Sequence, residues 1–192
     1  MARIPDKQAV FLELDGVITE RPSLTIDGEV PYYPGAIESL QRIDPNVFKI
    51  FIATNREDIA MGRLREREFK KFCDRFIQDT TEAGIQIQKI YSCPYHPKGR
   101  QRYRKDSVFR KPAPGMFKMA QQEFDLNLAR CWMIGHTTTD ILAGSRGGVG
   151  TILVETGEGG KDGSYLVDAN ETVPDIRYAV RFIQSYEMSL RC

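Results

Sequence analysis

The sequence has few of the features that mark a membrane-bound, secreted or nucleic-acid-binding protein. No apolar run approaches transmembrane length, and residues 1–6 lack the apolar core of a signal peptide. The formal net charge is only +1, so no overall field would attract nucleic acid or an anionic membrane. The four cysteines are scattered without a CxxC pair, which favours reduced thiols. We therefore expect a cytoplasmic protein with no membrane partner and no nucleic-acid partner.

Internal repeats and low-complexity segments are also missing, and a chain of 192 residues is long enough to bury a sizeable core. We therefore expect a single domain over residues 1–192. Apolar, β-favouring segments alternate with amphipathic ones, which predicts an α/β fold: a Rossmann-like, doubly wound parallel sheet with helices on both faces. At least five core strands are expected, at 9–14, 48–53, 88–92, 131–135 and 151–154. The longest expected helix covers 57–83, one helix opens near 114, and a C-terminal helix covers about 173–187.

The first of these strands ends in two carboxylates, Glu13 and Asp15, which are followed by Gly16. Residues two apart in an extended strand point to the same side, so the two carboxylates would share one face. Gly16 permits a sharp turn at that point. Open α/β sheets bind ligands beyond the carboxyl ends of their strands, which makes this pair a candidate site. A buried strand with a polar end is the alternative.

Polar side chains follow two further strands of the expected sheet. Thr54, Asn55 and Arg56 come after the second strand, and the segment from His136 to Asp140 comes after the fourth. The carboxyl ends of parallel strands meet at one edge, so these groups would gather around the first carboxylate pair.

Six segments of the chain carry a family resemblance, and they occur in the family's order. They are Phe11–Ile18, Tyr33–Ala36, Ala53–Asn55, Tyr91–Pro97, Arg110–Met116 and Met133–Gly144. Together they resemble the haloacid dehalogenase-like (HAD) phosphatases, most closely the D-glycero-D-manno-heptose 1,7-bisphosphate phosphatases and the related histidinol-phosphate phosphatase domain. The resemblance implies the HAD fold without a large cap domain. It also implies Mg²⁺-dependent hydrolysis of a phosphorylated small molecule, such as a sugar phosphate, by a monomer.

The resemblance also assigns a role to each matching position. In the family, the first aspartate of an Asp-x-Asp motif attacks phosphorus, and the second protonates the leaving oxygen; Glu13 and Asp15 hold these positions. Thr54 would bond to the phosphoryl group, and Lys111 would neutralise charge on nucleophile and phosphate. The implied catalytic set is therefore Glu13, Asp15, Thr54 and Lys111. The implied substrate contacts are Asn55, Arg56, Arg110 and Lys111, and the implied metal ligands are Glu13, Asp15, His136 and Asp140.

Two of these positions depart from the family pattern. Glu13 replaces the nucleophilic aspartate, and its extra methylene moves the carboxylate by about 1 Å, a misplacement that can cost on the order of 10²-fold in rate. His136 replaces a magnesium-binding aspartate, although imidazole suits softer metals than Mg²⁺. We therefore expect a sugar-phosphate phosphatase with weak or lost activity that uses Mg²⁺ if it is active. The alternative is a pseudoenzyme that binds a phosphorylated ligand or a protein partner.

The heptose branch also carries a structural zinc loop, whose counterpart here is the basic loop at 93–113. Cys93 keeps one ligand position, but Tyr95, Ser107 and Phe109 occupy the other three. A structural zinc is not expected, because one ligand cannot build the usual tetrahedral site. Packing of Tyr95, Tyr103 and Phe109 would order the loop instead.

Positive charge is concentrated within this loop, at residues 98–105. The loop should overhang the site, where it could guide a bisphosphate. Basic residues interleaved with an aromatic are also a weak signal for RNA, and a merely solvated loop is a further alternative.

Overall fold

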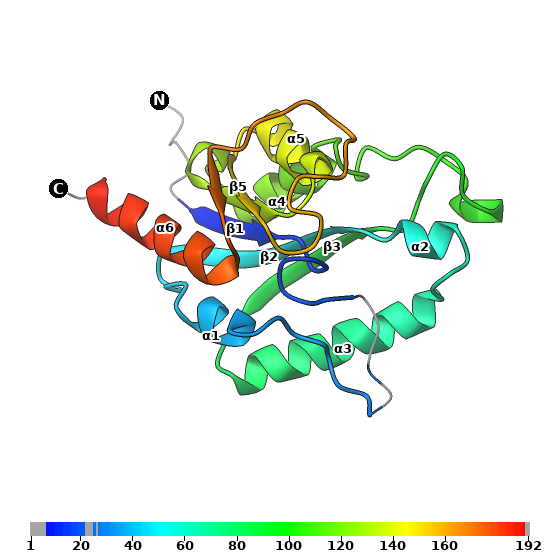
Figure 1. Ribbon diagram of the computed structural model, residues 1–192, viewed down its shortest axis with the longest axis horizontal. Helices are drawn as coiled ribbons and strands as arrows, with labels where there is room; N and C mark the ends of the chain where they lie inside the picture. Colours follow the sequence, from blue (N-terminus) through cyan, green and yellow to red (C-terminus); the bar gives the residue numbers. More distant parts are fainter. Residues whose placement is uncertain (1–6, 22–24, 26, 191–192) are drawn as a thin grey trace.

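The computed structural model describes residues 7–21, 25 and 27–190. Its centre is a six-stranded, all-parallel sheet with the strand order β3-β2-β1-β4-β5-β6 (Figure 1). This arrangement confirms the predicted Rossmann-like sheet. The strands are β1 (Gln8–Leu12), β2 (Phe48–Asn55), β3 (Ile87–Cys93), β4 (Trp132–Gly135), β5 (Gly150–Val154) and β6 (Glu171–Val173).

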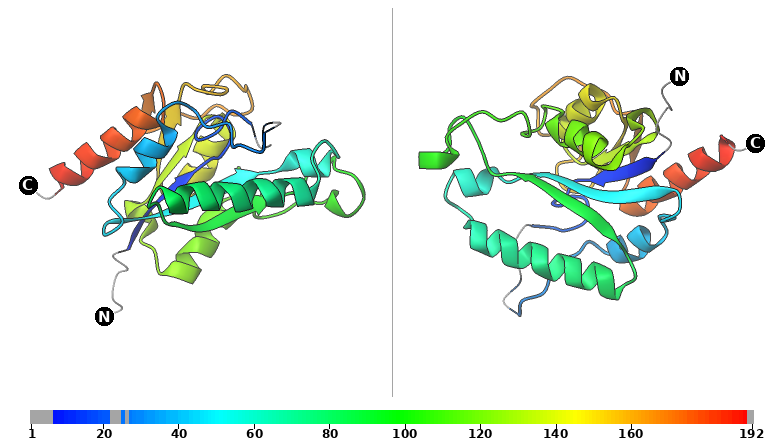
Figure 2. Two further views of the ribbon diagram at one scale, coloured as in Figure 1. Left: turned by 90° about the horizontal axis from the view of Figure 1, so that it is seen from below. Right: turned by 180° about the vertical axis from the view of Figure 1, so that it is seen from behind.

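Helices cover both faces of the sheet (Figure 1, Figure 2). One face packs against α1 (Ala36–Gln41), α3 (Glu66–Glu82) and α6 (Ile176–Ser189), and the other against α4 (Gly115–Phe124) and α5 (Thr138–Gly147). The carboxyl ends of the strands point to the right in Figure 1. The site residues that follow β1, β2 and β4 therefore share one edge.

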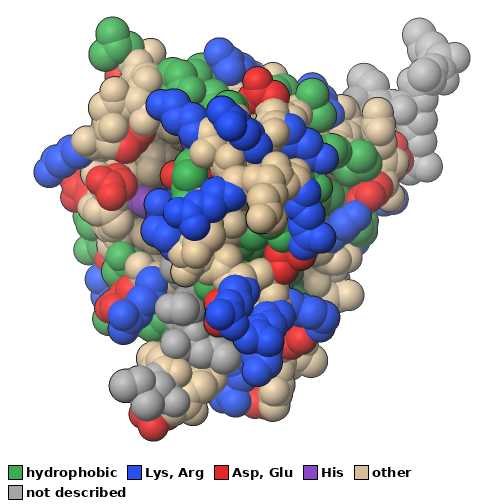
Figure 3. All heavy atoms as spheres, turned by 90° about the vertical axis from the view of Figure 1, so that its right-hand side faces the viewer, with side chains coloured by type: hydrophobic (Ala, Val, Ile, Leu, Met, Phe, Trp, Pro, Cys, Tyr) green, Lys and Arg blue, Asp and Glu red, His purple; other side chains and the backbone are tan. Residues whose placement is uncertain are grey.

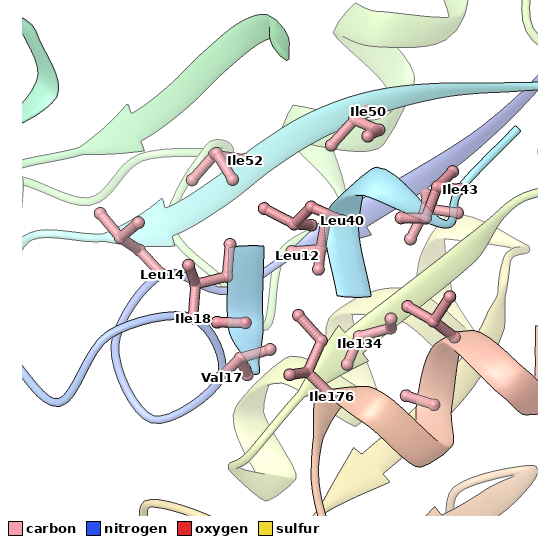
Figure 4. Packing of buried hydrophobic residues seen from close by; sticks show 14 of the residues in the cluster. Leu12, Leu14, Val17, Ile18, Leu40, Ile43, Ile50, Ile52, Ile134 and Ile176 are labelled. Atoms are coloured by element: carbon pink, nitrogen blue, oxygen red, sulfur yellow. The ribbon is translucent and has the colours of Figure 1, made fainter. Parts of the chain in front are cut away.

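The alternation of β1 explains why both layers form. Val10 and Leu12 point into the core beneath α1, α3 and α6, whereas Ala9 and Phe11 point into the core beneath α4 and α5. Phe11 stacks on Phe51 of β2 and meets Phe117 of α4 edge-on. All residues of β1 are buried, as expected for a central parallel strand. Figure 4 shows the first core, with Leu12, Leu14 and Ile134 around Leu40 of α1.

The long helix predicted over 57–83 was wrong, because the structure divides it into α2 (Glu57–Ala60) and α3. Gly62 has a positive φ of 74°, and the Asp58 carbonyl accepts bonds from two later amides instead of continuing a helix. At the start of α3, the Glu68 carboxylate accepts a bond of 2.9 Å from the backbone amide of Arg65. The predicted helix start near 173 was also early, since β6 occupies 171–173 and Asp175 caps α6.

The basic loop at 93–113 is ordered partly as predicted. The rings of Tyr95 and Tyr103 lie 6.4 Å apart, and the Lys105 ammonium sits 3.9 Å from the centroid of Tyr95. Phe109 packs against the core beneath α4. A short 3₁₀ turn, η1 (Gln101–Tyr103), lies within the loop. None of the helices in the part of the chain described here is long and apolar enough to cross a membrane.

Candidate active site

The polar residues that follow β1, β2 and β4 line one cavity of about 430 Å³ at the carboxyl edge of the sheet. Figure 3 looks onto this side of the molecule, where Lys and Arg side chains gather and a histidine lies in a recess beside acidic groups. The structure thus brings together the residues that the motifs singled out, with Thr54 and Lys111 buried beneath the cavity. The lining residues are Glu13, Asp15, Asn55, Arg56, Glu57, Asp58, His96, Arg110, His136, Thr137, Thr139, Asp140, Asp162 and Ser164.

Glu13 is buried directly after β1, and both of its carboxylate oxygens are engaged. Its Oε1 accepts bonds from the backbone amide of Leu14 (2.8 Å), from the hydroxyl of Thr54 and, at 3.4 Å, from the guanidinium of Arg56. Its Oε2 accepts a bond of 2.5 Å from the ammonium of Lys111. Four donors therefore converge on the residue at the nucleophile position.

Lys111 is fully buried and connects the segment after β1 with strand β2 and helix α5. Its Nζ donates to Glu13 Oε2 and to Asp140 Oδ1, each at 2.5 Å, and to the Ala53 carbonyl at 2.7 Å. Burial alone would lower the pKa of this lysine, but the two carboxylates outweigh that effect and raise it. At Asp140, burial is the largest influence and would raise the pKa, but Lys111 together with His136 and Thr137 lowers it. Both groups are therefore held in their charged forms.

Arg56 folds back onto the carboxylates of β1. Its side chain is only 2% exposed, and its Nη1 donates to Asp15 Oδ2 at 2.7 Å. Its Nε and Nη2 bond to the Thr54 hydroxyl, and the guanidinium lies 5.2 Å from the ring centroid of Phe69 in α3. Burial would lower the pKa of Arg56, but the neighbouring carboxylates raise it. The predicted substrate contact is thus an internal ion pair in this structure.

Asp15 keeps one open oxygen. Its Oδ2 bonds to Arg56, whereas its buried Oδ1 has no hydrogen-bond partner in the described part of the chain. Burial is the largest influence on this group, and it raises the pKa of Asp15 despite the opposing charge of Arg56. A carboxyl whose pKa is raised is better suited to the role of a general acid.

His136 is fixed by the loop that follows β5. Its Nδ1 accepts a bond of 2.9 Å from the Glu158 amide, so the neutral ring carries its proton on Nε2. The ring lies between Gly16 and Gly157, where a Cβ on either residue would collide with it. Its backbone amide and that of Thr137 both donate to Asp140 Oδ2 at 3.1 Å. His136 therefore presents a donor, not a lone pair, at its free nitrogen.

The remaining predicted contacts are also engaged within the protein. Asn55 bonds through both ends of its amide to the backbone of Lys111, each at 3.0 Å, so it positions that lysine. Arg110 pairs with Glu57 at 3.1 Å. Sequence reasoning missed two acidic residues that also line the cavity, Glu57 and Asp162. Asp162 accepts bonds of 2.7 Å from the amide and hydroxyl of Thr138 at the start of α5. A glycine-rich segment before Asp162 was the only hint that this loop returns to the site.

The oxygen atoms that a magnesium ion would need are mostly occupied. Asp140 spends one oxygen on Lys111 and the other on two backbone amides, and both oxygens of Glu13 have donors. Only Asp15 Oδ1 is open, and His136 Nε2 carries a proton. Within residues 7–21, 25 and 27–190, no group of three or more His, Cys, Asp or Glu side chains is arranged to hold a metal. The residues as placed do not fit Mg²⁺.

Comparisons with known proteins agree on one family. A family model described as HAD-hydrolase-like matches residues 108–177. A D-glycero-alpha-D-manno-heptose-1,7-bisphosphate 7-phosphatase from Burkholderia mallei is 35% identical over 149 residues, which cover 77% of this chain and 79% of that protein. The chain belongs to the HAD-like hydrolases. Within this HAD-like chain, the segment matched by the family model contains Lys111, His136 and Asp140.

Further relatives extend the likeness over more of the HAD-like chain. The D-glycero-beta-D-manno-heptose-1,7-bisphosphate 7-phosphatase of Pasteurella multocida is 28% identical and covers 88% of this chain and 96% of its own. The D,D-heptose 1,7-bisphosphate phosphatase of B. bronchiseptica, complexed with magnesium and phosphate, has a TM-score of 0.79 at 22% identity. That structure covers 94% of this chain and 99% of its own and shows the shared HAD fold.

Proposed function

We propose that this HAD-like chain binds a phosphorylated sugar in the cavity at the carboxyl edge and hydrolyses it weakly or not at all. Relatives named as heptose bisphosphate phosphatases support the ligand class. The observation that carries the second part is the set of four donors on Glu13, supplied by Leu14, Thr54, Arg56 and Lys111.

Hydrolysis by the family's route requires a carboxylate oxygen of Glu13 to attack phosphorus. A carboxylate oxygen would bond to phosphorus while the bond from phosphorus to the leaving oxygen breaks, and Asp15 would protonate that oxygen. Each donor on Glu13 stabilises the free carboxylate and lowers its nucleophilicity before any substrate arrives. The longer side chain also displaces the attacking oxygen by about 1 Å. Asp15 remains suited to the role of general acid, but Glu13 is poorly suited to the role of nucleophile.

A pseudoenzyme that only binds is the limiting case of this proposal, and one observation favours it. Two buried cations, Arg56 and Lys111, are already paired with Glu13, Asp15 and Asp140. These ion pairs hold the carboxylates of the centre without a substrate, whereas a working phosphatase needs a carboxylate that is free to attack phosphorus. A protein partner that covers the cavity would use the same closed centre.

The test combines turnover with binding. Phosphate release is measured over a panel of sugar phosphates that includes heptose 1,7-bisphosphate, with Mg²⁺, Mn²⁺ and Zn²⁺ in turn. The same compounds are screened for thermal stabilisation of the protein, which reports binding without turnover. We expect stabilisation by at least one sugar phosphate and release that is undetectable or slow. Glu13→Gln should remove any slow release. No stabilisation by any compound would contradict the proposed ligand class, and rapid release would contradict the loss of activity.

A further inference from the structure

We propose that the Arg56 guanidinium takes the place of the divalent cation in this centre. The histidine at position 136, which replaces a metal-binding aspartate of the family pattern, removes one ligand for that cation. The site would then accept its phosphorylated ligand without a metal. The statement about the ligand rests on the proposed function, whereas the statement about the metal rests on the ion pairs alone.

The guanidinium bridges Glu13 and Asp15, the two carboxylates that follow β1, as a bound cation would. Its Nη1 lies 2.7 Å from Asp15 Oδ2, and its Nη2 lies 3.4 Å from Glu13 Oε1. The Thr54 hydroxyl and the face of the Phe69 ring hold it from two further directions. A planar fork of donors suits two carboxylates at once, and its burial weakens competition from water. Arg56 is thus a fixed part of the centre.

The charge balance supports the same conclusion. Three buried or half-buried carboxylates, Glu13, Asp15 and Asp140, face two cations, Lys111 and Arg56, which leaves one net negative charge on these five groups. The resemblance implies an aspartate at position 136, whose carboxylate would raise the net negative charge to two, the charge that one divalent cation balances. With His136 in place of that aspartate, and with Arg56 paired to Glu13 and Asp15, less negative charge is left for a metal to balance.

Most of the atoms that could ligate a metal are already engaged within the protein. The Glu158 amide occupies His136 Nδ1, so binding a metal at Nε2 would break that bond or strip the proton. Asp140 has both oxygens engaged by Lys111 and by backbone amides at the start of α5. Among the carboxylate oxygens of Glu13, Asp15 and Asp140, only Asp15 Oδ1 accepts no hydrogen bond in the described part of the chain, so a metal at the other oxygens would compete with Arg56, Lys111 and backbone amides.

The experiment titrates Mg²⁺ into metal-free protein by calorimetry and measures the melting temperature with Mg²⁺ or with EDTA. The proteins are the native chain, Arg56→Gln with His136→Asp, and Arg67→Gln as a matched control on an exposed arginine of α3. We expect no heat of binding and no shift for the native and control proteins. The double variant should bind Mg²⁺ and gain roughly 3–6 °C at ten times its dissociation constant.

Magnesium binding by the native protein would overturn the proposal, and so would a folded double variant that stays indifferent to Mg²⁺. If circular dichroism shows that the double variant does not fold, the native titration still decides. Inorganic phosphate is then added as the ligand probe. We expect it to stabilise the native protein equally with Mg²⁺ and with EDTA, and a shift that requires Mg²⁺ would overturn metal independence. If phosphate does not change the melting temperature, the result counts against the proposed function. The Mg²⁺ titration then tests by itself whether Arg56 replaces the metal.

Discussion

Replacement of Lys111 by methionine tests the ion-paired centre most severely. The ammonium of Lys111 is fully buried and holds Glu13, Asp140 and the Ala53 carbonyl. Methionine has a similar length but no charge, so the variant leaves two buried carboxylates without their shared cation. Removing one partner of a buried ion pair costs about 3–5 kcal/mol, because the remaining charge is desolvated and unpaired. Two carboxylates depend on this lysine, which places the expected loss toward the upper end.

The loss is measured by urea unfolding, followed through the fluorescence of Trp132, the single tryptophan of the chain. A loss of 3–5 kcal/mol corresponds to a melting temperature lowered by roughly 6–20 °C in a chain of this size. The matched control is Lys70→Met, which breaks an exposed pair with Asp74 and should cost about 0.5 kcal/mol or less. Adding Glu13→Gln and Asp140→Asn to Lys111→Met should recover at least half of the loss, since it removes the unpaired charges.

A loss below about 1 kcal/mol for Lys111→Met would refute the reasoning, because it would mean that the two carboxylates do not depend on the lysine. A loss that the two neutral substitutions fail to reduce would also refute it. That result would assign the effect to packing of the side chain and not to its charge.

Three further predictions concern the surroundings of the site. Hydrogen bonds from Thr138 and its neighbours outweigh burial and lower the pKa of Asp162, so Asp162→Ala should cost about 1 kcal/mol in urea unfolding at pH 7. The difference in unfolding free energy between the native protein and the variant should be complete above about pH 4. It should vanish as the pH falls through the lowered pKa that Asp162 has in the folded state, and a difference independent of pH would contradict this prediction. Gly157→Ala should lower the melting temperature, because its φ is 63° and the new Cβ would meet the His136 ring. Adding His136→Ala should recover the part due to collision but not the strain of about 1 kcal/mol, and full recovery would contradict the φ argument. Burial raises the pKa of the Cys131 thiol to about 12, so iodoacetamide at pH 8 should label it only after unfolding; rapid labelling of the native protein would contradict that.

The sequence was sufficient for the sheet and for the place of the site. Buried β-favouring runs identify the central strands, and the polar residues at their ends, such as Glu13 and Thr54, identify the carboxyl edge. It was not sufficient for β6, whose three residues Glu171–Val173 carry no apolar run. It also missed the break at Gly62, because the surrounding charged residues all favour a helix. One glycine among these charged residues was too weak a signal to predict the end of a helix.

The ion pairs and hydrogen bonds among the site residues could not be predicted from the sequence pattern. Arg56 follows β2, where a ligand contact is a reasonable expectation, yet its guanidinium returns to Asp15. That direction depends on the turn into α2 and on the position of Phe69, which is set by the packing of α3. The proton on His136 Nε2 depends on an amide 22 residues later, in a loop without periodic signal. Contacts of this kind follow from tertiary structure and not from local sequence.

The most direct test of the account is the rate of phosphate release by the native chain beside the triple variant Glu13→Asp, Arg56→Gln, His136→Asp. Both are assayed on heptose 1,7-bisphosphate with Mg²⁺. The account predicts a native protein with little or no release and a folded variant whose kcat/KM is at least about 10²-fold higher, because it regains a placed nucleophile and a metal site. Efficient release by the native protein that Glu13→Gln abolishes, with no gain in the triple variant, would contradict it.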